Sequence, residues 1–213
     1  SSSLSASMKM ILVLTLLSLA PFLLVMVTSF TRIIVVLHFV RSALGTQTSP
    51  PNQVLIGIAL FLTLFIMAPV MTQINKDCIQ PYDKGKLTQE EALNAGLKPI
   101  RKFMFEQTNR KDIRLFMEIE KQSNDVSIEK EDEIPTLVLI PAFMISELRI
   151  AFIIGFLIYL PFIVIDMVVA STLMSMGMMM LPPTTISMPF KILLFVLADG
   201  WNLVIGQLVK TFY

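Results

Sequence analysis

Few ionisable side chains lie in the apolar parts of the sequence, and two of them could perform acid–base chemistry. Asp166 and Asp199 lie in or beside apolar runs, and two carboxyl groups sharing one proton would suit an intramembrane aspartyl protease. Lys191 lies between them, however, and the sequence around Asp199 matches no protease motif. Ionised groups in apolar helices are costly and usually pair with each other. We therefore favour an intramembrane ion pair of Asp166 with Lys191.

The spacing of these two residues supports the pair. The midpoint of positions 166 and 191 falls inside residues 177–183, a segment rich in Gly and Pro where a turn is expected. An antiparallel hairpin about that turn places Asp166 and Lys191 at the same height. The alternative is that each side chain faces solvent or another subunit.

A second pair of charges lies further back in the same apolar run. Glu147 and Arg149 are two positions apart, so they cannot face each other on a helix. We expect each to pair elsewhere, with contacts between subunits as one option.

The sequence offers few residues for other kinds of catalysis. His38 is the only histidine and Cys78 the only cysteine, so neither a Cys–His nucleophile nor a metal-ligand cluster is indicated. We predict no enzymatic activity, no metal and no cofactor. The small net charge of +1 offers no basic patch for nucleic acid.

Methionines gather at the expected turn. The cluster is bounded by residues that shape loops, Gly177 on one side and Pro182 with Pro183 on the other. Its members are Met174, Met176, Met178, Met179 and Met180. Methionine is flexible and often fills irregular apolar gaps, so ordinary packing is one interpretation. The other is a loop whose tip, Met178 to Met180 with Met176 beside it, projects into a pore as an apolar seal.

The elements that position these residues are apolar helices. Hydrophobic residues make up 54% of the chain and charged residues only 15%. Of the 33 charged residues, 24 lie between Lys76 and Glu133. This pattern predicts an all-α, membrane-associated protein in three parts: a first apolar hairpin (1–75), a polar, mostly helical insert (76–133) and a second apolar hairpin (134–213).

Four stretches are long enough to span a bilayer, which takes about 20 apolar residues. They are residues 10–30, 54–74, 134–165 and 192–209. Because Arg32 and Arg41 lie in the first connection without an acidic residue, we place that connection in the cytoplasm. The N-terminus and the insert are then outside the cytoplasm, an orientation that favours a cleaved signal peptide.

The third stretch is too long for one perpendicular span. Its 32 residues would extend about 48 Å as one helix, against a hydrocarbon core of about 30 Å. Pro141 and Pro161 could break it, as Pro21 could break the first stretch. Tilting is one explanation for the excess length, and burial against other subunits is the other.

The insert carries signals of short soluble helices. Thr88 and Glu91 have the spacing of a capping box, and Pro99 suits the first turn of another helix. The apolar residues repeat at helical spacing. They form one face with Ile100, Phe103 and Met104, a second with Ile113, Phe116 and Met117, and an adjacent line with Leu115 and Ile119. Residues 123–133 are expected to be a solvated loop.

Two loops share one pattern. Gly45 is followed by four residues and then Pro50 and Pro51, as Gly177 is followed by four residues and then Pro182 and Pro183. The pattern suggests an internal repeat of two helical hairpins, although chance is a rival because membrane loops favour Gly and Pro.

Several of these segments together resemble the FliP family of export-gate proteins from flagella and injectisomes. The segments that carry the resemblance are 28–36, 41–45, 49–53, 140–148, 165–171, 176–183, 190–193 and 198–201. The resemblance implies a non-enzymatic ring of five copies, joined by FliQ, FliR and other export-apparatus proteins, through which unfolded substrates enter type III secretion. It also implies a methionine gasket at Met178, Met179 and Met180.

The resemblance favours the flagellar branch. It places the protein in the bacterial inner membrane at the flagellar basal body, with residues 76–133 in the periplasm. A virulence injectisome homologue is the first alternative. A small-solute transporter or ion channel is the second, and it would require polar groups along its path.

Overall fold

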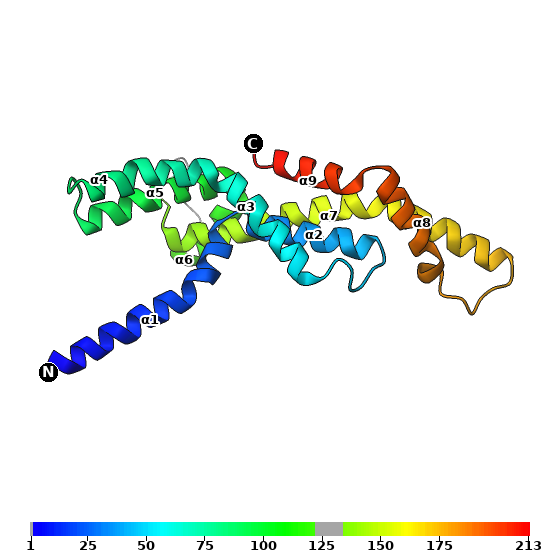
Figure 1. The fold of residues 1–213 in the computed structure, drawn as a ribbon, viewed down its shortest axis with the longest axis horizontal. Coiled ribbons are helices and arrows are strands. Elements are labelled where there is room, and N and C mark those ends of the chain that lie inside the picture. Colours follow the sequence, from blue (N-terminus) through cyan, green and yellow to red (C-terminus); the bar gives the residue numbers. More distant parts are fainter. Residues whose placement is uncertain (1, 122–133) are drawn as a thin grey trace. The chain divides into compact units, whose positions relative to one another are not determined.

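The computed structural model describes residues 2–121 and 134–213, and every regular element in these ranges is a helix (Figure 1). In chain order the elements are α1 (Ser2–Val27), α2 (Phe30–Ala43), α3 (Asn52–Ile74), the π-helix η1 (Asn75–Ile79), α4 (Gln80–Asp83), α5 (Gln89–Gln107), α6 (Arg110–Lys121), α7 (Thr136–Ser175), α8 (Pro183–Leu197) and α9 (Gly200–Lys210). The predicted all-α class is confirmed.

The chain forms two compact units. Unit 1 comprises Ser1–Thr31 and Gln73–Met144, and unit 2 comprises Arg32–Thr72 and Ile145–Tyr213. Long helices contribute to both, since α7 is a single helix of 40 residues.

Several helices are suited to a membrane. Two continuous helical stretches, Asn52–Asp83 and Thr136–Ser175, are long and apolar enough to cross one. The number rises to four if the pair α1 and α2 and the pair α8 and α9 each form one bent span. The prediction of a membrane-associated protein is thereby confirmed.

The proline breaks predicted in the apolar stretches are wrong. Pro141 and Pro161 lie inside α7, which continues unbroken to Ser175. An apolar helix tolerates proline because neighbouring groups compensate the lost hydrogen bond.

The first apolar stretch does break, but not at its proline. α1 continues through Pro21 and ends at Val27. The hydroxyl of Thr28 then accepts a hydrogen bond from the backbone N–H of Phe30 at 3.4 Å, where α2 begins. A threonine side chain that binds a free N–H favours a new helix start.

In unit 1, the capping box at the start of α5 is confirmed. The Thr88 hydroxyl accepts from the Glu91 backbone N–H at 3.3 Å, and the Glu91 carboxylate accepts from the Thr88 backbone N–H at 2.8 Å. The predicted helix start at Pro99 is wrong, because Pro99 lies inside α5. Buried contacts at Ala92 on one side and Phe103 on the other keep the helix continuous across the proline.

The core of unit 1 joins α5, α6 and the first part of α7. Phe103 and Phe143 meet edge to face with ring centroids 6.0 Å apart. The predicted apolar faces supply further buried side chains, Met104, Ile113 and Met117, while the predicted solvated loop lies outside the described residues. Arg101 secures the start of α7 by donating to the carbonyl of Ile134 at 2.6 Å.

The core of unit 2 joins α2, α7 and α8. Its buried members are Val40, Ala43, Leu44, Phe162 and Phe195. A close approach of α2 to α7 depends on Gly155, because a Cβ atom there would lie 2.4 Å from the Phe39 ring. Phe195 also packs edge to face on Trp201, which connects α8 to α9.

The capping box predicts a pH dependence at the start of α5. The Thr88 backbone N–H and then its hydroxyl donate to the charged carboxylate, and both bonds lower the pKa of Glu91. The stabilisation of the start of α5 by the Glu91 carboxylate is therefore present at neutral pH. It is lost as the pH falls through that lowered pKa.

Hydrogen exchange of the full chain in detergent can measure this effect. We expect the first-turn amides of α5 to lose protection on acidification below the lowered pKa of Glu91. In Glu91→Gln the protection should no longer change over that range. An identical acid response in the variant would show that Glu91 is not the titrating group.

Candidate functional site

The methionine-rich turn connects α7 to α8 in unit 2. α7 ends in a Schellman motif, in which the backbone N–H of Met178 donates to the Leu173 carbonyl and that of Gly177 to the Met174 carbonyl, both at 3.0 Å. Gly177 has a φ of +74°, a conformation that side chains other than glycine rarely adopt. Pro182 caps α8, and Pro183 is its first residue. The tip therefore lies between two well-defined helix ends.

The methionines at this tip point away from the unit. Met179 is 84% exposed and Met180 is 98% exposed, and the side chains of Met176 and Met178 are exposed as well. Ordinary core packing within the chain does not account for these side chains. The tip offers an apolar, flexible surface to whatever surrounds it.

Asp166 and Lys191 come together at the base of the same hairpin. The Lys191 Nζ lies 2.6 Å from the Asp166 Oδ2, and the lysine side chain is almost fully buried. The Ser187 hydroxyl donates to the other oxygen of Asp166. Ser187 was missed from the sequence, although its position one turn before Lys191 on α8 puts it on the same face.

The turn between α2 and α3 covers this ion pair. Gly45 has a φ of +77°, close to that of Gly177. A Cβ atom at Gly45 would lie 3.8 Å from Met188 and 4.0 Å from the Lys191 Nζ. Leu44 beside it is buried. The first hairpin therefore packs against the base of the second.

The two Gly–Pro-Pro turns differ in their chemistry. In the first turn, Arg41 donates to the Pro50 carbonyl at 3.2 Å and to the Asn52 side chain at 2.6 Å. The Thr46 hydroxyl also donates to the Ser49 carbonyl at 2.5 Å. The first turn is thus held by polar contacts, whereas the second presents methionine.

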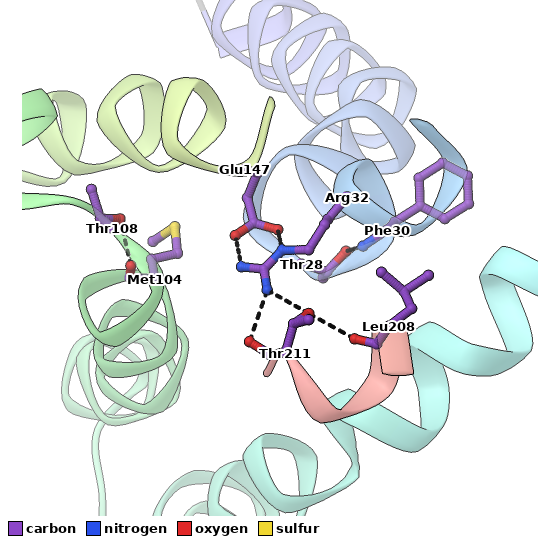
Figure 2. A network of polar contacts seen from close by, with 8 residues as sticks. All are labelled: Thr28, Phe30, Arg32, Met104, Thr108, Glu147, Leu208 and Thr211. Carbon is purple, nitrogen blue, oxygen red and sulfur yellow. Dashed lines mark hydrogen bonds and ion pairs between the residues drawn. The ribbon is translucent and has the colours of Figure 1, made fainter. Parts of the chain in front are cut away.

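A second buried ion pair joins α2 to α7. Arg32 and Glu147 form a two-pronged contact in which the Arg32 Nε donates to the Glu147 Oε2 at 2.9 Å (Figure 2). Both side chains are buried. Glu147 thus has a partner within its own chain. The intersubunit roles of Glu147 and Arg149 stay predictions.

Arg32 also holds the C-terminal turn. Its Nη1 donates to the carbonyl and the hydroxyl of Thr211, each at 3.0 Å (Figure 2). The guanidinium carbon lies 3.8 Å from the centre of the Phe212 ring, a cation–π distance. From the sequence we assigned Arg32 only a role in membrane orientation, although a cation within an apolar run is itself a signal of a buried partner.

The two candidate catalytic carboxylates have separate partners. Asp166 is committed to Lys191 and Ser187. Asp199 lies at the break between α8 and α9 with a φ of +50°, and its Oδ2 accepts from the Asn202 side-chain amide at 3.0 Å. These contacts favour structural roles for both aspartates over a shared-proton dyad.

Taken together, these features define an all-α, membrane-associated protein whose buried ion pairs fasten two helical hairpins. Comparison with known proteins gives a more specific identification. The family model described as "FliP family" matches residues 13–208. The chain belongs to the FliP family, as the resemblance predicted.

Relatives match over nearly the whole chain. The flagellar biosynthetic protein FliP of Bacillus subtilis is 53% identical over 208 residues, which cover 98% of this chain and 93% of the relative. The FliP of Pectobacterium carotovorum is 48% identical, with 97% of this chain and 79% of the relative covered. The FliP of Aquifex aeolicus is 48% identical, with coverages of 97% and 86%.

The Asp166–Lys191 contact predicts that assembly depends on charge pairing. Asp166→Ala or Lys191→Ala should each leave an unpaired charge, at a cost of about 3–5 kcal/mol, and should reduce recovery of assembled complex. The exchange Asp166→Lys with Lys191→Asp should partly restore recovery. Mild single variants together with an exchange no better than either would contradict the pairing.

The Arg32–Glu147 contact predicts a similar asymmetry in stability. Glu147→Gln leaves the buried Arg32 without its counter-ion and should lower the free energy of unfolding by about 3–5 kcal/mol. The double variant Arg32→Met, Glu147→Met leaves no unpaired charge and should lower it by less. Thermal unfolding of the detergent-solubilised protein measures the loss of stability in the single and in the double variant.

A matched control for this experiment is the exposed pair of Lys102 and Glu106, whose Nζ and Oε1 are 3.9 Å apart. Removing Lys102 should cost at most about 1 kcal/mol. A Glu147→Gln variant as stable as this control would contradict the role given to the buried pair.

Proposed function

We propose that this protein is a pore-forming subunit of the flagellar type III protein export gate. In this proposal it has no enzymatic role, and a ring of five copies passes unfolded flagellar substrates across the bacterial inner membrane. FliQ, FliR and other export-apparatus proteins complete the gate. The observation that carries the proposal is the exposed methionine tip on a firmly held hairpin.

The chemistry of the tip suits an export pore. Such a pore must block ions at rest and still pass many different unfolded chains. Thioether side chains are apolar enough to exclude water and flexible enough to reshape around varied cargo. Met178, Met179 and Met180 carry no charge that would select among substrates. Symmetric copies of this tip would form a closed ring of methionine.

The length of α7 supports assembly with other subunits. Its 40 residues correspond to about 60 Å at the standard helical rise, about twice the thickness of a hydrocarbon core. Most of its large apolar side chains in unit 2 are exposed, for example Phe152, Phe156 and Leu157. Lipid can cover only part of such a helix, so neighbouring subunits are the natural cover for the rest.

The charge distribution supports an orientation. We assign the turn between α2 and α3, with Arg41, to the cytoplasmic side and residues 76–133 to the periplasm. The protein would then lie in the inner membrane at the flagellar basal body.

The alternatives receive less support. An injectisome subunit could use the same hairpins, but the relatives reported above are named flagellar biosynthetic proteins. A small-solute transporter would need polar groups along its path. In unit 2 the charges of Asp166, Lys191, Arg32 and Glu147 neutralise each other instead.

The proposed seal predicts an ion leak. In the variant Met178→Ala, Met179→Ala, Met180→Ala, the shortened side chains should leave a gap that fills with water. Membranes containing the assembled variant should conduct small ions above the wild-type level, while export continues at least in part.

A matched control replaces three exposed methionines outside the tip, Met8, Met10 and Met71, by alanine. This control should not leak. Wild-type ion flux through an assembled triple variant of the tip would refute the seal.

A further inference from the structure

The insert carries an apolar groove that none of the described residues of unit 1 fills. It lies between the segment from η1 to α4 and the facing helix α5, and its volume is about 850 Å³. Its apolar walls include Ile74, Cys78, Ile79, Tyr82, Leu93 and Leu97. Leu93 is 65% exposed although it belongs to the part of the chain richest in charge.

A separate apolar ridge lies on α6. Ile113 and Met117 are buried in the core of unit 1, whereas Leu115 and Ile119 are 46% and 62% exposed. These two residues are four positions apart and lie on one line along the helix. Neither of them lines the groove. Unit 1 therefore presents a concave and a convex apolar surface made of different residues.

Two exposed apolar surfaces are unfavourable in water. Exposed Leu and Ile side chains forgo the free energy that burial away from water would provide, and contiguous exposed apolar patches mark sites of interaction. Lipid does not provide the cover if the insert lies in the periplasm. A protein surface is the cover that suits an apolar patch in an aqueous compartment.

The charges beside the two surfaces complement each other. Glu90 lines the groove about one turn before Leu93 and two turns before Leu97 on α5. Lys111 is exposed about one turn before Leu115 and two turns before Ile119 on α6. Each surface therefore has a charge followed by two apolar side chains in the same chain direction. A parallel alignment of the two helices places the carboxylate of Glu90 opposite the ammonium of Lys111.

We propose that the α6 ridge of one copy of this chain docks into the groove of the next copy. Contact between two different surfaces is heterologous, and repeating it around an axis forms a ring where the rotation between neighbours closes. The inference rests on the proposed function, because it requires the chain to assemble with itself. It deepens that function by assigning the surfaces of the insert through which neighbours meet.

The native cysteine provides a direct test. Cys78 lies in the groove wall and is the only cysteine in the chain, so Ile119→Cys introduces a single second thiol on the ridge. The full assembled complex is oxidised in its membrane with copper phenanthroline and examined by non-reducing electrophoresis. We expect a ladder of covalently joined chains, which Cys78→Ser in the same variant abolishes.

A control places the second thiol elsewhere on the insert. Lys102 is 68% exposed and lies on the side of α5 opposite Leu93. Lys102→Cys should therefore give no ladder. A ladder of equal strength from this control would overturn the proposal, because it would show that the thiols meet without the docked geometry.

Charge exchange tests the alignment of the two helices. Glu90→Lys or Lys111→Glu, each added to Ile119→Cys, should cause loss of most of the ladder, and the two changes together should restore it. Equal ladders from all these variants would overturn the parallel alignment.

The mass of the unoxidised complex separates this inference from the proposed function. A multimer of wild-type mass without a ladder overturns the docking proposal and leaves the export-gate proposal intact. A disulfide confined to single chains likewise overturns the docking proposal. A single-chain mass in mild detergent overturns the proposed function itself.

Discussion

Charged side chains within apolar helices need partners, and this requirement fixes how unit 2 is built. Arg32 and Glu147 join α2 to α7, and Lys191 and Asp166 join α8 to α7. An isolated buried charge is costly. Each ion pair therefore favours the one relative register of its two helices that brings the charges together. Arg32 also links the first ion pair to the C-terminal turn, because it donates to the Thr211 carbonyl. Many large apolar side chains of α7 and α8 remain exposed and are available to lipid and to neighbouring chains.

The position of the methionine tip depends on the contacts that hold its hairpin. A flexible side chain can form a defined seal only if its backbone is held, and here both ends of the turn are fixed by the Schellman motif at Gly177 and by Pro182 and Pro183. The ion pair lower in the hairpin holds α7 and α8 together, and the turn at Gly45 packs over it. The base of the hairpin is therefore held by an ion pair and by packing, whereas the side chains at its tip are flexible methionines.

Local rules predicted the parts of the fold whose causes are local. The capping box at Thr88 and the turn at Gly177 follow from residue types at short spacing, and the meeting of Asp166 with Lys191 follows from hairpin symmetry. The contact of Arg32 with Glu147 could not be derived in this way, because 115 positions separate the two residues and no single hairpin relates them. The prolines inside α5 and α7 do not break these helices, because packing and the apolar surroundings outweigh their local preference.

In the proposed export gate, the methionine tips of several copies converge on one axis. Met179→Cys in a Cys78→Ser background places one thiol per chain at this exposed tip, and oxidation of the assembled complex in its membrane then reports the distance between tips. We expect efficient disulfide-linked dimers, because neighbouring tips in a ring lie within reach of one another. An intact complex in which the thiols at position 179 react with small reagents but never with each other would contradict this convergence.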